Sequence, residues 1–370
     1  MGIPLIQQYR VGCYLLGRKL RRVKRYPLVL MLEPLFRCNL ACAGCGKIDY
    51  PDAILNKRLS LAECLAAADE CGAPIISIAG GEPLIHKEMP QIVASLIARK
   101  KFIYLCTNAL LLPKHIDQYQ PSRYLSFSIH LDGNHIRHDT SVCRKGVYDK
   151  AVTAIRLARE RGFRVTINCT LFQGEKADEI ADFFDAVMEM DVEGITVAPG
   201  FSYEHAPDQD GFLQRAASKR LFRNVFRIGR KRHWRLNHSS LYLDFLAGNQ
   251  SYQCTPWGNP TRNVFGWQRP CYLLVDEGYA PSFRALIEDT DWDRYGVGRN
   301  PKCADCMAHC GFEPTAVDAT FSHPLQALRT ALHGPRTEGP MAPELPVRYG
   351  HPSIQHAVPS ELPIHREHSV

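Results

Sequence analysis

Apolar and polar positions along this 370-residue chain follow two alternating patterns. Short runs rich in Ile, Val, Leu, Phe and Tyr are typical of strands that are buried on both faces of a sheet. Such runs occur at 28–33, 74–79, 102–106, 124–130, 164–170 and 194–198. Stretches with apolar residues at helical spacing separate them, at 60–68, 89–100, 147–161 and 177–189. The repeated strand–helix order predicts an α/β fold built as a partial (βα)6 parallel barrel.

The composition divides the chain into four parts. Residues 1–27 are a basic, amphipathic N-terminal arm, and residues 28–236 hold the barrel pattern. Residues 237–320 are expected to form a smaller, Cys-rich C-terminal module with a short hairpin. Residues 321–370 are rich in Pro, His, Glu and Arg and poor in aliphatics, so a mostly disordered tail is expected there.

The basic N-terminal arm, within a chain of net charge +7, admits two interpretations. One is a helix packed over the bottom of the barrel with its basic face in solvent. The other is a segment that lies on an anionic membrane surface. A second basic stretch, at 211–236, is expected to be a solvated helix face, with a membrane surface or nucleic acid as alternatives. Because no RNA-binding motif accompanies this stretch, no nucleic-acid partner is expected.

Three cysteines follow the first predicted strand at the spacing C-x3-C-x2-C, namely Cys38, Cys42 and Cys45. Three thiolates this close together can hold three irons of one cubane cluster, so that the fourth iron is open to a substrate or cofactor. A zinc knuckle or structural cysteines are the alternatives, but zinc normally takes four closed ligands, often from two C-x2-C pairs. The spacing therefore predicts a [4Fe-4S] cluster.

A second motif, Gly80-Gly81-Glu82-Pro83, directly follows the second predicted strand. Together the two motifs resemble the radical S-adenosylmethionine (SAM) superfamily. The resemblance implies that the GGEP stretch binds the methionine end of SAM, whose amino and carboxylate groups the open iron chelates. One position departs from the superfamily pattern: the residue before the third cysteine is usually aromatic and is Gly44 here. We therefore expect different packing over the cluster or the adenine.

The resemblance also implies where the remainder of SAM binds. In barrels of this kind the chemistry lies at the carboxyl ends of the strands. In the superfamily, polar residues at the ends of the third to fifth strands bond the carboxylate, ribose and adenine of SAM. The matching positions are Asn108, Ser128, Asp132 and Asn168. Each of them alone is more often a turn residue, and only their succession along the rim indicates a site.

Over roughly residues 1–320 the sequence is similar to a narrower family, the HpnH radical SAM proteins of hopanoid biosynthesis (adenosylhopane synthases, or adenosyl hopene transferases). The stretches that carry this likeness read CNLACAGCGKI, SIAGGEPLIH and CADCMAHCGFEPTAV. The resemblance implies that a 5′-deoxyadenosyl radical adds to the alkene of diploptene, a hydrophobic triterpene, to give adenosylhopane, the precursor of C35 hopanoids. It also implies an electron donor such as flavodoxin or ferredoxin.

Such an addition leaves a tertiary carbon radical that needs a hydrogen atom, or an electron and a proton. Cys106 closes the third predicted strand beside the expected cofactor rim, and it is the candidate catalytic residue. A thiol S–H bond is weaker than the tertiary C–H bond it would form, so the transfer runs downhill. A cysteine at a buried strand end is otherwise a small apolar residue, and Cys169 and Tyr203 are rival donors.

Cysteines in the C-terminal module suggest a further metal site. Cys303, Cys306 and Cys310 have the spacing C-x2-C-x3-C, and Cys254 and Cys271 precede them. A second iron–sulfur cluster is one interpretation, and a zinc site or reduced structural cysteines are the others.

Fourteen cysteines without a secretory signal predict a reducing, cytoplasmic location. The basic arm and the hydrophobic triterpene substrate that the resemblance implies predict peripheral contact at the inner face of the cytoplasmic membrane. Two other functions are alternatives. One is another radical SAM enzyme, such as a peptide maturase with an auxiliary-cluster module. The other is a non-catalytic iron–sulfur protein, which would need no SAM site.

Overall fold

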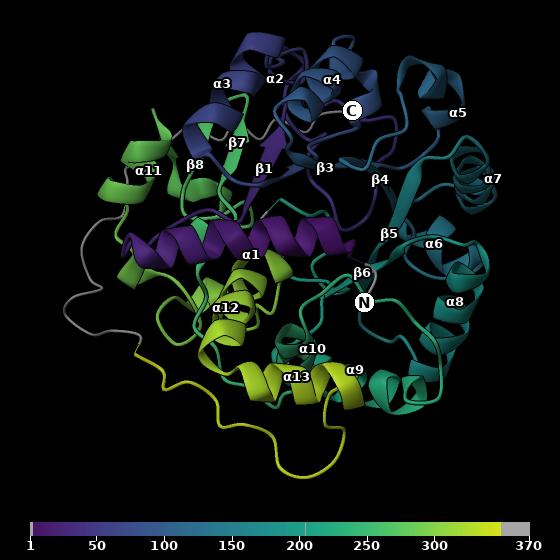
Figure 1. The fold of residues 1–370 in the computed structure, drawn as a ribbon. Coiled ribbons are helices and arrows are strands. Elements are labelled where there is room, and N and C mark those ends of the chain that lie inside the picture. The colour runs from purple at the N-terminus through teal and green to yellow at the C-terminus, as the bar shows by residue number, and fades with distance from the viewer. Residues whose placement is uncertain (1–2, 204, 349–370) are drawn as a thin grey trace, which may run out of the picture.

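One nine-stranded sheet organises the fold in the computed structural model, which describes residues 3–203 and 205–348 (Figure 1). Its strands lie in the order β6-β5-β4-β3-β2-β1-β7-β8-β9, and the first six of these are parallel to their neighbours. They are β1 (Val29–Glu33), β2 (Ile75–Ile78), β3 (Phe102–Thr107), β4 (Leu125–His130), β5 (Arg164–Leu171) and β6 (Gly194–Pro199). Each end lies within one residue of the predicted run, which confirms the partial (βα)6 barrel.

The expected helices cover the outer face of this sheet (Figure 1). They are α3 (Leu61–Cys71), α4 (Met89–Ala98), α7 (Val147–Glu160) and α8 (Ala177–Glu189). Shorter helices α2 (Asp52–Leu55), α5 (Leu112–His115) and α6 (His135–Ser141) lie between the larger ones. A capping box opens α3, where the Ser60 amide donates to Glu63 Oε2 at 2.8 Å and the Glu63 amide donates to Ser60 Oγ at 3.3 Å.

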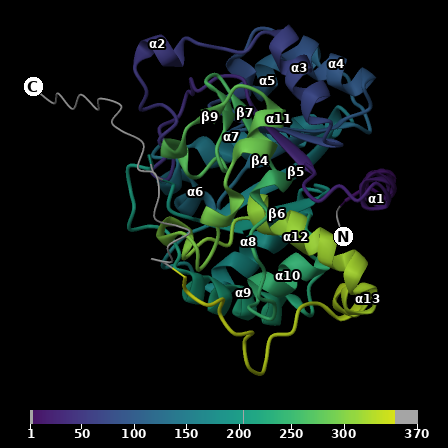
Figure 2. The ribbon, with the colours of Figure 1, turned by 90° about the vertical axis from the view of Figure 1, so that its left-hand side faces the viewer.

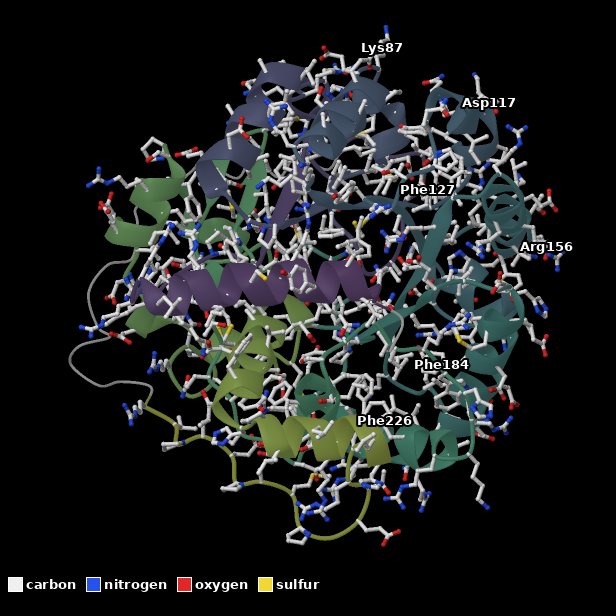
Figure 3. All side chains as sticks on the ribbon, viewed as in Figure 1. Lys87, Asp117, Phe127, Arg156, Phe184 and Phe226 are labelled. Carbon is white, nitrogen blue, oxygen red and sulfur yellow. The ribbon has the colours of Figure 1, made fainter. Side chains whose placement is uncertain are left out.

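Alternation along each strand separates a helix-facing side from a barrel interior. On β3, Leu105 is fully buried in the core under the helices, whereas Cys106 on the opposite face is half-buried. On β5, Cys169 belongs to the fully buried face, and Asn168 lies on the other. Phe127 of β4, labelled in Figure 3, is fully buried in the same core. Because neighbouring side chains on a strand point to opposite faces, these two sets cannot exchange places.

Helix α1 (Leu5–Leu20) lies across the amino ends of the strands (Figure 1). The side chain of Gln7 donates to the hydroxyl of Tyr104 on β3 at 2.9 Å, and the guanidinium of Arg10 lies 5.5 Å from the ring centre of Tyr124. Gln7 and Leu15 are its buried residues. The arm therefore packs over the bottom of the barrel, as the first of its two interpretations expected.

The C-terminal part does not build a separate sheet but extends the barrel sheet. Strand β7 (Thr261–Asn263) pairs in parallel with β1, and β8 (Gly266–Gln268) and β9 (Tyr279–Ala280) continue as an antiparallel meander. The helices of this part are α9 (Arg215–Gly229), α10 (Ser240–Leu246), α11 (Phe283–Asp289) and α12 (His309–Ser322). The division into domains at the predicted boundaries stays a prediction.

Two expectations about polar segments need correction. The segment expected as disordered begins with an ordered helix, α13 (Pro324–His333), which packs on α10 and α12; residues 349–370 lie outside the described residues. The basic stretch around α9 is not solvated throughout, because Arg215 and Lys219 are buried. Both pair with the carboxylate of Glu344, at 3.0 Å for Arg215, which compensates the two buried charges.

Candidate active site

The loop after β1 carries Cys38, Cys42 and Cys45. Their thiols are close enough for the charges of Cys38 and Cys45 to affect the pKa of Cys42. Burial raises the pKa of Cys38 to about 11 and raises the pKa values of Cys42 and Cys45 above their ordinary value. Since burial disfavours the bare thiolates, they are stable in this loop only with a cationic partner. Iron supplies that positive charge, so the donor set fits an iron–sulfur cluster.

The GGEP motif lies directly against this loop. A Cβ on Gly80 would be 2.3 Å from the carbonyl oxygen of Leu35, and one on Gly81 would be 2.1 Å from that of Arg37. The Gly81 amide donates to Leu35 at 2.9 Å, and the Glu82 amide donates to Arg37 at 3.0 Å. Glycine is required at both positions because no side chain fits between the end of β2 and the cysteine loop.

The carboxylate of Glu82 is bound entirely by donors of the chain. It accepts hydrogen bonds from the Leu84 amide at 3.1 Å, the Thr107 hydroxyl at 2.8 Å and the Asn108 amide at 2.9 Å. Burial raises its pKa to about 7, against the effect of these donors. Glu82 therefore joins the end of β2 to the end of β3, and Pro83 begins the short 3-10 turn Pro83–Ile85 that follows it.

Asn108 connects the two sequence motifs. Its side-chain Nδ2 donates to Asn39 Oδ1 at 2.7 Å and lies 3.8 Å from Cys38 Sγ, while its backbone amide is bound by Glu82. The fold thus brings residues 38, 82 and 108 together at the carboxyl rim, as the rim argument predicted.

Asp132 lies at the same rim, between the ends of β4 and β5. Its carboxylate pairs with His130 Nε2 at 2.7 Å and accepts bonds from the Thr170 amide at 2.8 Å and the Ser141 hydroxyl at 3.0 Å. Burial would raise the pKa of Asp132, but His130 and the Thr170 amide hold it below its ordinary value. Burial opposes the charged imidazole of His130, yet Asp132 raises its pKa above the ordinary value. The His130–Asp132 pair fixes the loop that follows β4.

Cys106 faces the inside of the barrel one layer below the rim. Its Sγ lies 3.4 Å from Ser77 Oγ, and in the sheet register it stands beside Ser128, which is followed by Thr166. Burial raises the pKa of Cys106, so the group is a protonated thiol at neutral pH. The rival Cys169 faces the helices instead.

The remaining predicted positions are less closely grouped. Ser128 lies two residues before the end of β4, deeper than the rim. Asn168 stands beside His130 in the register and is half-buried. The hydroxyl of Tyr203 is buried, and its ring lies 5.3 Å from the Lys47 ammonium; Glu204 lies outside the described residues.

The sequence did not predict two features near the cysteines. The ring of Phe172, just after β5, lies 3.2 Å from where a Gly44 Cβ would stand, so it fills the space over the loop that an aromatic residue at position 44 would occupy. A buried ion pair joins Lys47 to Glu33 at 2.9 Å. The absence of an aromatic residue before Cys45 indicated that another group fills this space. The sequence did not indicate that the group is Phe172, just after β5.

Five cysteines of the C-terminal part line one pocket. They come from three separate segments and are Cys254, Cys271, Cys303, Cys306 and Cys310. A Cβ on Gly311 would be 2.3 Å from Cys254 Sγ, so glycine at that position allows Cys254 to approach the helix that carries Cys310. Within residues 3–203 and 205–348, no three His, Cys, Asp or Glu side chains lie close enough to share one metal ion. The site predicted from three cysteines thus has five cysteines around one pocket.

Comparison with known proteins identifies the domain that carries the two motifs. The sequence model of the Radical SAM superfamily matches residues 32–187, which contain the cysteine loop, the GGEP motif and strands β2 to β5. These residues form a radical SAM domain. A second model, a domain of unknown function (DUF3463), matches residues 195–330. This radical SAM domain binds SAM and a [4Fe-4S] cluster, and its three thiols, its glycine cradle and Asn108 fit both groups.

The radical SAM domain has curated relatives of limited similarity. GTP 3′,8-cyclase of Listeria welshimeri is 28% identical over 185 residues, covering 48% of this chain and 55% of the cyclase. Molybdenum cofactor biosynthesis protein 1 of Drosophila melanogaster is 29% identical over 167 residues, covering 44% of this chain and 30% of that protein. The chain thus spans about half the length of the cyclase, and neither likeness assigns a substrate to this chain.

Solved structures agree on the fold. SuiB of Streptococcus suis bound to its precursor peptide SuiA superposes with a TM-score of 0.62 at 16% identity, covering 82% of this chain and 74% of SuiB. SuiB bound to S-adenosylmethionine gives a TM-score of 0.56 at 18% identity, covering 68% and 61%. At these identities the likeness concerns the radical SAM fold alone. None of the proteins named here is an adenosylhopane synthase, so the narrower resemblance is not established by them.

Proposed function

We propose that this radical SAM enzyme joins the 5′-deoxyadenosyl group of SAM to the terminal alkene carbon of diploptene, forming a C–C bond and giving adenosylhopane. The proposal rests on the resemblance over roughly residues 1–320, which continues through the DUF3463 region. The named relatives, in contrast, match less than half of the chain.

The observation that supports the proposal most is the direction of Cys106. When bound, the cluster and SAM supply a carbon-centred radical. Addition of that radical to an alkene leaves a new carbon radical, and a thiol inside the barrel can end the reaction. Cys106 gives the hydrogen atom of its S–H bond to that carbon, forming a C–H bond and leaving a sulfur radical. One electron from an external donor such as flavodoxin or ferredoxin, with one proton, restores the thiol.

The other polar groups hold the reactants in place. The backbone of Gly80 and Gly81 and the side chain of Asn108 receive the methionine end of SAM beside the cysteine loop. The ribose and adenine are oriented by Ser128, Asp132 and Asn168. Asp132 acts through the two groups that it binds, the Thr170 amide and the His130 imidazole. Fixed positions of this kind convert an encounter into an intramolecular reaction.

We also propose that the C-terminal pocket holds a second iron–sulfur cluster. Its ligands come from the predicted set Cys303, Cys306 and Cys310, together with Cys254 and Cys271, which line the same pocket. A cubane holds each thiolate on a different iron, so it tolerates wider spacing than a single zinc ion does.

A second candidate is a radical SAM enzyme that acts on a polar substrate, such as a nucleotide or a peptide. Its support is the likeness to GTP 3′,8-cyclases and to SuiB. The buried hydroxyls of Ser126 and Thr166, for which no hydrogen-bond partner is found among the described residues, also favour polar contents for the inner barrel. In this candidate the adenosyl radical abstracts hydrogen from the substrate.

The fate of the adenosyl group separates the two candidates. Reconstituted enzyme is incubated anaerobically with SAM, a reductant and diploptene, and in parallel with GTP. The proposal expects adenosylhopane by mass spectrometry, with little free 5′-deoxyadenosine. Free 5′-deoxyadenosine with unchanged diploptene, or turnover of GTP, would favour the second candidate.

A further inference from the structure

Helix α1 carries an exposed apolar stripe on the side away from the barrel. Leu5, Tyr9, Leu16 and Leu20 are between 53% and 82% exposed, and Cys13 between them is exposed as well. The spacings of four, four, three and four residues place all five on one face of the helix. The face that α1 buries is the opposite one, with Gln7 and Leu15.

A second stripe runs along the distant helix α13. Leu325, Leu328 and Leu332 are between 57% and 82% exposed, and Phe321 at the end of α12 is 43% exposed. These four, with the four large residues of α1, are eight of the ten exposed large hydrophobic residues within the described part of the chain. Such side chains are therefore concentrated here rather than scattered singly over the surface.

The two stripes lie on the same side of the molecule. Both helices face the viewer in Figure 1 and lie along the right-hand edge in Figure 2. Asp318 joins α1 to α12, the helix that precedes α13, since it pairs with Lys19 Nζ at 2.8 Å and accepts a bond from the Tyr26 hydroxyl at 2.8 Å. The Lys19 ammonium also lies 5.1 Å from the ring centre of Phe321. We call this surface the two-helix face, made of Leu5, Tyr9, Leu16, Leu20, Phe321, Leu325, Leu328 and Leu332.

Positive charge predominates beside the two-helix face. Residues 1–32 contain seven lysines and arginines and no Asp or Glu, and residues 319–337 also contain no Asp or Glu. Arg21, Arg22 and Lys24, which follow α1, are exposed. The nearby carboxylate of Asp318 is already paired with Lys19. An apolar surface whose neighbours are mostly basic complements a partner that offers hydrocarbon and negative charge together.

We propose that the two-helix face docks on an anionic lipid bilayer. The apolar side chains enter the boundary between headgroups and acyl chains, and the basic side chains meet the anionic headgroups, as interfacial amphipathic helices do. None of the described helices has the length and apolar character needed to cross a bilayer, so the contact proposed is with the surface. Since α1 covers the amino ends of the strands, docking leaves the rim with the cysteine loop on the far side. The face is thus an anchor and not the substrate entrance.

The inference is tested by vesicle flotation of the full chain, a measurement that involves no turnover and does not depend on the proposed substrate. Vesicles of phosphatidylcholine, with and without phosphatidylglycerol, are compared at low and high salt. We expect flotation only with the anionic vesicles, and less of it at high salt. The variant Leu16→Gln/Leu20→Gln should bind at least about tenfold more weakly, since each buried CH2 contributes about fourfold. Leu325→Gln/Leu332→Gln should lose as much.

Charge and apolar surface each have a matched control. Arg21→Gln/Lys24→Gln should weaken binding by about fivefold for each basic side chain. The control Lys87→Gln/Arg156→Gln removes two cations that lie at other edges of the molecule (Figure 3). Ile136→Gln removes an equally exposed apolar residue, 67% exposed, from α6, which lies on the side opposite α1 in Figure 2. Both controls should float like the unsubstituted protein, and all variants should keep its melting temperature.

Several results would overturn the proposal. The unsubstituted chain could stay in the lipid-free fractions, or the stripe variants could float as well as it does. Ile136→Gln could also lose as much flotation as the stripe variants lose. Sedimentation separates the remaining alternative: if the chain is a dimer that the stripe variants convert to monomers while flotation is unaffected, the face is covered by a second copy.

Discussion

The thiol of Cys106 lies 3.4 Å from the hydroxyl of Ser77, on the inner face of the barrel. Two strands away, Cys169 is buried on the opposite side of the sheet, under the helices. The chain therefore offers two strand cysteines that point in opposite directions. This pair makes the proposed hydrogen donation testable with a matched control.

We predict that Cys106→Ala still cleaves SAM and forms the C–C bond but fails to end the reaction normally. The product should contain less saturated adenosylhopane, an altered ratio of epimers at the new centre, or an unsaturated by-product. In D2O the unsubstituted enzyme should place one deuterium at that centre, because the thiol proton exchanges with solvent. Mass spectrometry and chiral chromatography of the products measure both effects.

Cys169→Ala is the control for this prediction, since its thiol cannot reach the interior. It should lower stability by about 1 kcal/mol and leave the product unchanged. If Cys106→Ala gives the normal yield and configuration, the thiol is structural, and Tyr203 becomes the candidate donor.

A second prediction concerns the two sets of cysteines. A variant with Cys38, Cys42 and Cys45 all changed to Ala should lose SAM cleavage completely, because the open iron is absent, yet keep about half of its iron and sulfide. Changing Cys303, Cys306 and Cys310 to Ala should remove the other half. Anaerobic iron and sulfide analysis with electron paramagnetic resonance measures both sets. Loss of all iron in the first variant would exclude a second cluster, and retained SAM cleavage would exclude the first assignment.

The glycine cradle gives a third prediction. Gly81→Ala places a Cβ 2.1 Å from the carbonyl oxygen of Arg37, so the cysteine loop must move. We expect a loss of about 1–3 kcal/mol in the free energy of unfolding, together with poor retention of iron. Gly12→Ala on α1 is the control, because its Cβ would meet no atom within 4 Å and alanine favours the helix by up to about 1 kcal/mol. Denaturant melts and iron analysis that find the two variants alike would refute the cradle.

The fourth prediction is a pH dependence at Glu175, which lies 3.0 Å from Arg137 and accepts a bond from the Phe172 amide. Burial raises its pKa from 4.5 to about 7, against these two partners. A carboxyl group with a raised pKa binds its proton more tightly in the folded state. Its contribution to stability is therefore highest at low pH and declines as the pH rises from about 4.5 to about 7.

Glu175→Gln cannot titrate, so it escapes this decline. Relative to the unsubstituted protein, its free energy of unfolding should improve by about 2 kcal/mol between pH 5 and pH 8. Urea melts across this range measure the difference, and Glu179→Gln, a nearby exposed carboxylate, should give a small, constant difference. A constant difference for Glu175→Gln would show that burial does not raise its pKa.

The sequence alone located the six parallel strands to within one residue and placed the cysteine loop and the GGEP motif at their carboxyl ends. Both successes have a local cause. Strands buried on two faces need continuous apolar runs, and cluster ligands such as Cys38 and Cys42 come from a single short loop. The closeness of Asn108 to that loop also followed, because the carboxyl ends of parallel strands share one edge of the sheet.

Only the tertiary structure decided which way side chains point and which distant segments meet. Cys106 and Cys169 look alike in sequence, and pairing of the strands gave them opposite faces. Phe172 fills the space over Gly44 because two strand ends converge there. The pocket of five C-terminal cysteines and the two-helix face are each assembled from segments far apart in the chain. Such contacts arise from packing between elements, and periodicity within one element carries no information about its partners.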